Sequence, residues 1–150
     1  DTLFIQGALL ENKLTVAPKK GKKLIFTDPF IYHALKAWII PSADPFQTQI
    51  KTCLVDTELC AGLVEAAVAS HFRRHYPTYY IKAEGEVDVV YVDSERFWPI
   101  EIKWTSQLRQ KSLKQIMKYP NGRIWGKTRV ATTLSGISVE PLALALFLAG

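Results

Sequence analysis

Residues 79–104 constrain the fold more than any other part of this chain. They contain three closely spaced runs rich in Val, Ile, Tyr and Trp, namely Tyr79–Lys82, Glu86–Val92 and Phe97–Trp104. Because β-branched and aromatic residues favour extended backbone, each run predicts a β-strand. The polar run Asp93–Arg96 predicts a turn between the last two strands, which would then pair as an antiparallel hairpin.

Helical patterns lie on both sides of these strands. Asp56 or Thr57 can cap a helix with a wide apolar stripe that continues to about Arg74. The order of helix, strands, helix, strands and final helix predicts an α/β fold in which helices flank a mixed sheet. After the three strands we expect a helix over 108–119, short strands over 123–125 and 130–133, and a helix that starts at Pro141.

The part of the chain before residue 56 contains two local signals. Leu14–Ala17 and Lys23–Thr27 are short apolar runs on either side of Pro18–Lys22, which predicts a β-hairpin. Asp28 followed by Pro29 is typical of a helix start, because Asp accepts hydrogen bonds from free backbone N–H groups and Pro fits the first helical position.

The charges are unevenly distributed along the chain. The 150 residues carry a net charge of +5, and 48% are hydrophobic, which excludes a disordered chain. Nine of the fourteen acidic residues lie in Asp56–Glu101, whereas Ile102–Val139 contains eight basic residues and no acidic one. On a helix, Lys111, Lys114 and Lys118 would share one face. That face is either a contact for a nucleic-acid backbone or an ordinary solvated surface.

Several classes of protein are disfavoured by the sequence. Cys53 and Cys60 form no disulfide framework, so we expect two buried thiols in a reducing, cytoplasmic protein. The apolar run Pro141–Ala149 is too short to cross a bilayer, so no membrane association is expected. Gly122–Thr128 has three residues between its glycines where a P-loop has four, so we expect no nucleotide site. The first residue is Asp1 rather than Met, which suggests a portion of a longer protein.

The candidate functional residues lie in the hairpin. Glu101 and Lys103 are two apart on one strand and therefore point the same way. If Val92 pairs with Phe97 across the turn, the same register places Asp88 opposite Glu101. Carboxylates placed so close repel each other, so a positive charge is expected between them. Lys103 and a divalent cation are the two candidates.

The chemistry of this group suits a hard metal ion. Mg²⁺ binds through one or two carboxylates, and Glu65 on the preceding helix could supply another. Such an ion lowers the pKa of bound water, and Lys103 could stabilise the developing negative charge. The alternative is that Glu101-Ile102-Lys103 is a charged strand edge that prevents aggregation. The apolar residues around it favour the clustered site.

These residues carry a resemblance to a known superfamily. Asp88, followed after twelve residues by Glu101-Ile102-Lys103, resembles the signature of the PD-(D/E)XK nucleases. Three segments also resemble the C-terminal domain of unknown function found on prokaryotic AAA+ ATPases: Gly21–Pro29, Leu63–Ala69 and Gly85–Asp88.

The resemblance implies a fold, a site and a context. The fold would be restriction-endonuclease-like over 56–150, preceded over 1–55 by the remainder of a winged-helix-like region and a linker helix. Glu65, Asp88 and Glu101 would bind Mg²⁺ or Mn²⁺, with Asp88, Glu101 and Lys103 catalytic. An AAA+ ATPase domain would precede this chain in the full-length protein.

Two functions agree with these expectations. The first is metal-dependent hydrolysis of phosphodiester bonds in DNA. The second is a catalytically inactive nuclease-fold module for docking to DNA or for contacts with the ATPase. The complete set of acidic residues favours the first.

Overall fold

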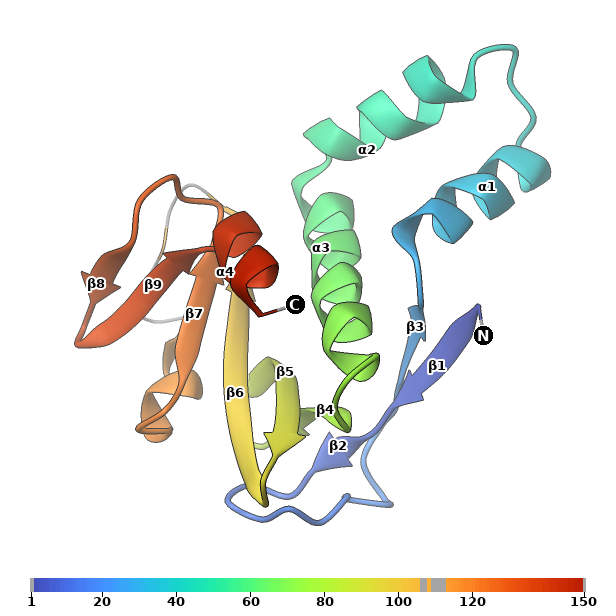
Figure 1. Ribbon diagram of the computed structural model, residues 1–150. Helices are drawn as coiled ribbons and strands as arrows, with labels where there is room; N and C mark the ends of the chain where they lie inside the picture. Colours follow the sequence, from blue (N-terminus) through green and yellow to red (C-terminus); the bar gives the residue numbers. More distant parts are fainter. Residues whose placement is uncertain (1, 106–107, 109–112, 150) are drawn as a thin grey trace.

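A seven-stranded mixed sheet forms the centre of the domain (Figure 1). The computed structural model describes all residues except 1, 106–107, 109–112 and 150. Parallel pairs join β2 to β4, β6 to β7 and β7 to β9, and the other neighbours are antiparallel. In spatial order the strands are β2 (Ala8–Leu9), β4 (Thr78–Lys82), β5 (Glu86–Asp93), β6 (Arg96–Lys103), β7 (Arg123–Gly126), β9 (Ile137–Pro141) and β8 (Thr132–Leu134). The predicted mixed α/β fold is confirmed.

The β5–β6 hairpin has the predicted register from the turn as far as Val89 and Ile100, and the expected pair of Asp88 with Glu101 is not part of the ladder. Val92 pairs with Phe97, and the ladder continues without a shift past Pro99 to Val89 and Ile100. The turn needs only two residues outside the strands, Ser94 and Glu95, both of which have positive φ angles of 50° and 61°. Two such residues match the right-handed twist of the flanking strands, but side chains other than Gly or Asn are strained there.

This strain predicts a stabilising substitution. Glu95→Gly removes the Cβ that disfavours the left-handed conformation, so we expect a gain of about 1 kcal/mol in unfolding free energy. Urea unfolding measures the change. Glu95→Ala keeps the Cβ and should give little gain, and an equal gain from both variants would contradict the explanation.

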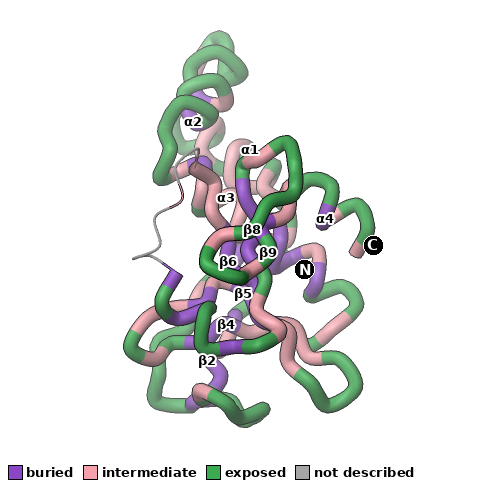
Figure 2. The backbone as a smooth tube through the Cα atoms, turned by 90° about the vertical axis from the view of Figure 1, so that its left-hand side faces the viewer, coloured by how far each residue is buried: buried purple, intermediate pink, exposed green. Residues whose placement is uncertain are grey.

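Two core clusters cover the two faces of the sheet. On one face lie α3 (Thr57–Arg73) and α4 (Leu142–Leu148); on the other lies the 3₁₀ turn η3 (Ile116–Lys118) with Leu113 and Tyr119 on either side of it. Figure 2 shows that burial is concentrated in the strands and the helix faces that pack on them. The first cluster includes Val68, Ala69, Phe72, Val89, Ile100, Ile102, Trp125, Leu142 and Ala145, and the second includes Leu9, Val87, Val90, Leu113, Ile116, Tyr119, Ile124 and Val139.

Helix α3 begins as the sequence predicts. The Asp56 side chain accepts a hydrogen bond from the backbone N–H of Leu59 at 3.0 Å, which makes Asp56 the N-cap. The final helix likewise follows Pro141. Cys53 and Cys60 are free and buried. None of the described helices is both long enough and apolar enough to cross a membrane.

The N-terminal strands pair differently from the prediction. β3 (Lys23–Phe26) pairs with β1 (Leu3–Gln6), so the expected hairpin with residues 14–17 is wrong. The reason is burial: Leu9 and Ala17 are both enclosed, and residues 14–17 turn back along β2 instead. An arm follows that points away from the sheet in Figure 1, formed by α1 (Pro29–Ile39), the π-helical turn η1 (Phe46–Ile50) and α2 (Lys51–Val55). Asp28 caps α1 as predicted.

The helix predicted over 108–119 is not an α-helix where the structure describes it. Residues 113–119 contain η3 instead. Leu113, Ile116 and Tyr119 are all buried at a spacing of three, which a 3₁₀ turn matches more closely than an α-helix. Periodicity in the basic residues therefore predicted the wrong helix type, because the apolar residues decide how the segment packs.

Candidate metal and catalytic site

A β-bulge positions Asp88. On β4, Tyr79 pairs with Val90 and Ile81 pairs with Val87, so two residues of β5, Asp88 and Val89, oppose the single residue between them. Val87 and Val90 consequently pack in the same cluster although they are three apart. Bulges of this kind redirect a side chain and are common beside active sites.

Asp88 lies where β5 and β6 part. Beyond Val89 and Ile100 the ladder ends, and the backbone N–H of Ile102 donates to the Asp88 carboxylate at 2.7 Å. The side chain thus replaces a backbone acceptor. This contact holds Asp88 beside the strand that carries Glu101 and Lys103.

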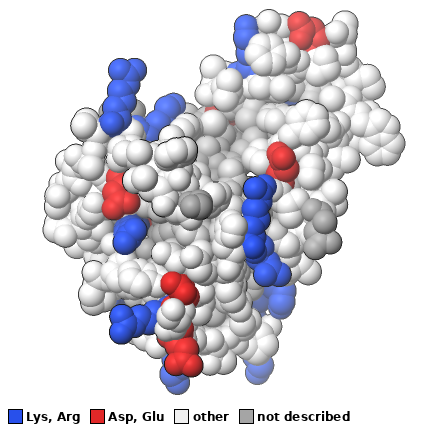
Figure 3. Space-filling model, viewed as in Figure 1, with Lys and Arg blue, Asp and Glu red and all other residues white. Residues whose placement is uncertain are grey.

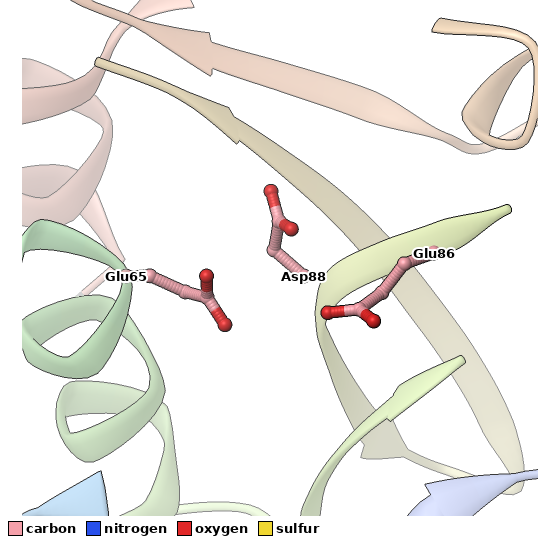
Figure 4. Close-up of side chains that lie close together, drawn as sticks. All are labelled: Glu65, Glu86 and Asp88. Carbon is pink, nitrogen blue, oxygen red and sulfur yellow. The ribbon is translucent and has the colours of Figure 1, made fainter. Parts of the chain in front are cut away.

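Two further carboxylates converge on Asp88 (Figure 4). Oxygen atoms of Glu65, Glu86 and Asp88 all lie within 4.8 Å of one another, and each of these residues is half-buried. Glu65 comes from the middle of α3 and Glu86 from the first position of β5. The sequence prediction included Glu65 and Asp88 but missed Glu86, although its place two residues before Asp88 was a usable signal.

Glu101 and Lys103 form a partly buried ion pair on β6. The Lys103 ammonium group contacts Glu101 Oε1, and the Glu101 side chain is only 5% exposed. The other carboxylate oxygen, Glu101 Oε2, is buried and has no hydrogen-bond partner among the described residues. An unpartnered buried carboxylate oxygen is costly, and a cation is one group that would stabilise it.

The surroundings of Asp88 and Glu101 disfavour ionisation of both of their carboxyl groups. Burial, then Glu65, raises the pKa of Asp88 to about 6, against the opposing influence of Lys103 and the Ile102 N–H. Burial, then Asp88, raises the pKa of Glu101 well above its usual range, although Lys103 acts in the opposite direction. Perturbed carboxyl groups of this kind are typical of functional sites.

Lys23 is a second lysine in this group, and the sequence did not single it out. Its ammonium group contacts Glu65 at 2.6 Å and also contacts Glu86. Burial disfavours the charged form of Lys23, but Glu65 and Glu86 outweigh burial and raise its pKa above the usual value. Lys23 is 42 residues from Glu65 in the sequence, so no local pattern could reveal the contact.

Two of the three predicted nucleic-acid-binding lysines lie among the described residues. Lys118 forms ion pairs with Glu11 and Glu84, Lys114 is exposed, and Lys111 lies outside the described residues. On the face shown in Figure 3, Lys and Arg side chains occur in separate groups with acidic side chains between them. Nearer the site is Lys127, which is exposed and whose backbone N–H donates to the carbonyl of Lys103 at 3.0 Å.

The segment 122–128 agrees with the prediction made for it. Residues 123–126 form β7, and Lys127 follows as a surface lysine. The segment is therefore a strand and not a phosphate-binding loop between a strand and a helix.

The fold and site together describe a mixed α/β domain with an acidic cluster at the point where strands β5 and β6 separate. The model of the family described as domain of unknown function (DUF4143) matches residues 61–135, and the chain belongs to this family. The match includes most of α3 and the strands β4 to β8, and so contains the carboxylates of the site. No curated protein and no solved structure matches the chain.

Proposed function

We propose that this domain hydrolyses phosphodiester bonds of DNA with Mg²⁺ or Mn²⁺ as the cofactor. The observation that carries the proposal is the convergence of Glu65, Glu86 and Asp88 beside the partly buried Glu101–Lys103 pair. The donor set fits the ion, because hard carboxylate oxygens are the ligands that Mg²⁺ and Mn²⁺ prefer. The unpartnered Glu101 Oε2 is a further group that a bound cation would stabilise.

Each residue has a separate role in this proposal. Asp88 and Glu101 would hold the metal ion with assistance from Glu65, and the ion would supply polarisation of the phosphodiester and a more acidic water. Lys103 places a positive charge beside them, where it can stabilise the negative charge that develops on phosphate oxygens. Lys127, which is exposed and directly follows β7, is suited to contact the DNA backbone.

The wider context is part of the same proposal. The resemblance to PD-(D/E)XK nucleases supports a restriction-endonuclease-like fold over 56–150. The resemblance to the C-terminal domains of prokaryotic AAA+ ATPases supports an ATPase domain earlier in a longer, cytoplasmic chain. Residues 1–55, with the β1–β3 pair and the α1–α2 arm, would then be the remainder of a winged-helix-like region.

Incubation with supercoiled, linear, branched and single-stranded DNA tests the proposal. With Mg²⁺ or Mn²⁺ we expect cleavage of at least one substrate, and EDTA should abolish it. Lys103→Met should reduce the rate about 100-fold or more, because the charge next to the reacting phosphate is lost. Lys13→Met, an exposed lysine, is the matched control and should retain the rate.

One outcome would favour the alternative function. If the wild-type chain binds DNA but cleaves none of the four substrates with either metal, the domain is a docking module of the same fold. The expected difference between Lys103→Met and Lys13→Met then disappears.

A further inference from the structure

The acidic cluster contains a positively charged side chain of the protein itself, the ammonium group of Lys23. Lys23 Nζ contacts one oxygen of Glu65 and one of Glu86, two of the three carboxylates that lie within 4.8 Å of one another. Three of the four acids of the site thus form ion pairs, Glu65 and Glu86 with Lys23 and Glu101 with Lys103.

The position of Lys23 is fixed through its backbone. Lys23 pairs with Gln6 in the β1–β3 ladder. At the other end of β3, the carbonyl of Phe26 accepts a hydrogen bond from the Ser70 hydroxyl on α3 at 2.8 Å. Because α3 also carries Glu65, the strand and the helix hold the lysine and its acid in register.

The Lys23 side chain also contacts an aromatic ring in this position. Its ammonium group lies 4.9 Å from the centre of the Tyr80 ring, within the range of a cation–π contact. The side chain is 25% exposed, so it can also turn towards water. It can therefore leave the two glutamates without any movement of the strand.

We propose that Lys23 is a positioning residue that occupies the acidic cluster in place of a metal ion and is exchanged for the ion when it binds. This inference rests on the metal site of the proposed function. Without metal, Lys23 holds Glu65 and Glu86 in place and offsets their repulsion from Asp88. When a divalent ion enters, the lysine withdraws, and the ion must compete with it for the same oxygens.

The exchange predicts that removing the lysine charge strengthens metal binding. In the full 150-residue chain, Lys23→Met should bind Mn²⁺ about ten-fold or more tightly than wild type, because a like charge a few ångströms from the ion is gone. The same variant should have a lower thermal stability than wild type in EDTA, and addition of Mn²⁺ should restore that stability. Isothermal titration calorimetry and thermal unfolding measure the two effects.

Two variants separate this role from a structural one. Lys23→Arg keeps the charge and should bind Mn²⁺ as weakly as wild type. Lys82→Met removes a lysine that also contacts Glu86, at 2.9 Å, but whose side chain is 54% exposed. Its screened charge should alter the Mn²⁺ affinity less than about two-fold. A lysine that only stabilised the fold would lower stability when replaced but would not tighten metal binding.

NMR of the wild-type chain provides an independent measurement if Lys23→Met does not fold. The Lys23 side-chain signal is assigned as the one that is absent from the spectrum of Lys23→Arg. Titration with Mg²⁺ should shift this signal until the site is saturated, and should leave the Lys82 signal in place. An unchanged Lys23 signal, or equal or weaker Mn²⁺ binding by Lys23→Met, overturns the exchange. Failure to bind Mn²⁺ in both proteins overturns it as well. Tighter binding by Lys23→Met in a domain that cleaves no DNA would reject the nuclease function and keep the exchange.

Discussion

Asp88→Asn is expected to make the metal-free domain more stable and, at the same time, to remove its response to Mn²⁺. The physical reason is that burial and Glu65 raise the pKa of Asp88 from 3.8 to about 6, so the ionised carboxylate destabilises the folded chain. An Asn side chain carries no charge, and its oxygen can still accept the Ile102 N–H. We expect a gain of about 1 to 2 kcal/mol in EDTA at pH 8.

The pH dependence of this effect follows from the direction of the pKa shift. For an acid whose pKa is raised by folding, the destabilisation is present above the folded pKa of about 6 and absent below the unfolded pKa of 3.8. The difference between Asp88→Asn and wild type should therefore be largest at pH 8, shrink through pH 6 and be small at pH 4. Thermal unfolding in EDTA across this range measures it.

Addition of Mn²⁺ should reverse the order of stability. At a concentration 100 times the dissociation constant, binding adds about 2.7 kcal/mol to wild type, and the variant should gain almost none of it. Asp93→Asn, an exposed acid at the other end of β5, is the matched control and should change neither property. A variant less stable than wild type in EDTA, or one with an intact Mn²⁺ response, would contradict this account of the site.

The second large effect is expected in the core. Phe72 on α3 is 2% exposed, stacks on Tyr91 with ring centres 4.4 Å apart, and lies 5.6 Å from the Trp125 ring. Phe72→Ala removes these contacts and leaves a cavity between α3 and the sheet. Substitutions of this kind cost about 3 to 5 kcal/mol.

Thermal and urea unfolding measure the cost. A loss of this size corresponds to a decrease of roughly 10 °C in the Tm of a domain of this length. Phe147→Ala on α4 replaces a phenylalanine that is 82% exposed and should cost little. Similar losses for both variants would mean that α3 does not pack on the sheet as described.

The hairpin of the site could be predicted because its determinants are local. The polar turn limits how Val92 and Phe97 can pair, and that pairing fixes the register of the whole hairpin. The N-cap Asp56 and the apolar stripe of α3 are local signals too, so the helix that carries Glu65 was also predicted. The pairing of β3 was not, since several short apolar runs near the N-terminus were equally suitable partners.

The sequence alone determined the mixed α/β class, the three consecutive strands and the placing of acidic residues on the hairpin and on the helix before it. Only the tertiary structure decided which charges meet. The bulge at Asp88 depends on pairing with β4, and Lys23 reaches Glu65 because β3 packs along α3. Strand periodicity acts over a few residues, whereas a cluster of charges is assembled by elements far apart in the chain. Its geometry therefore follows from packing rather than from local pattern.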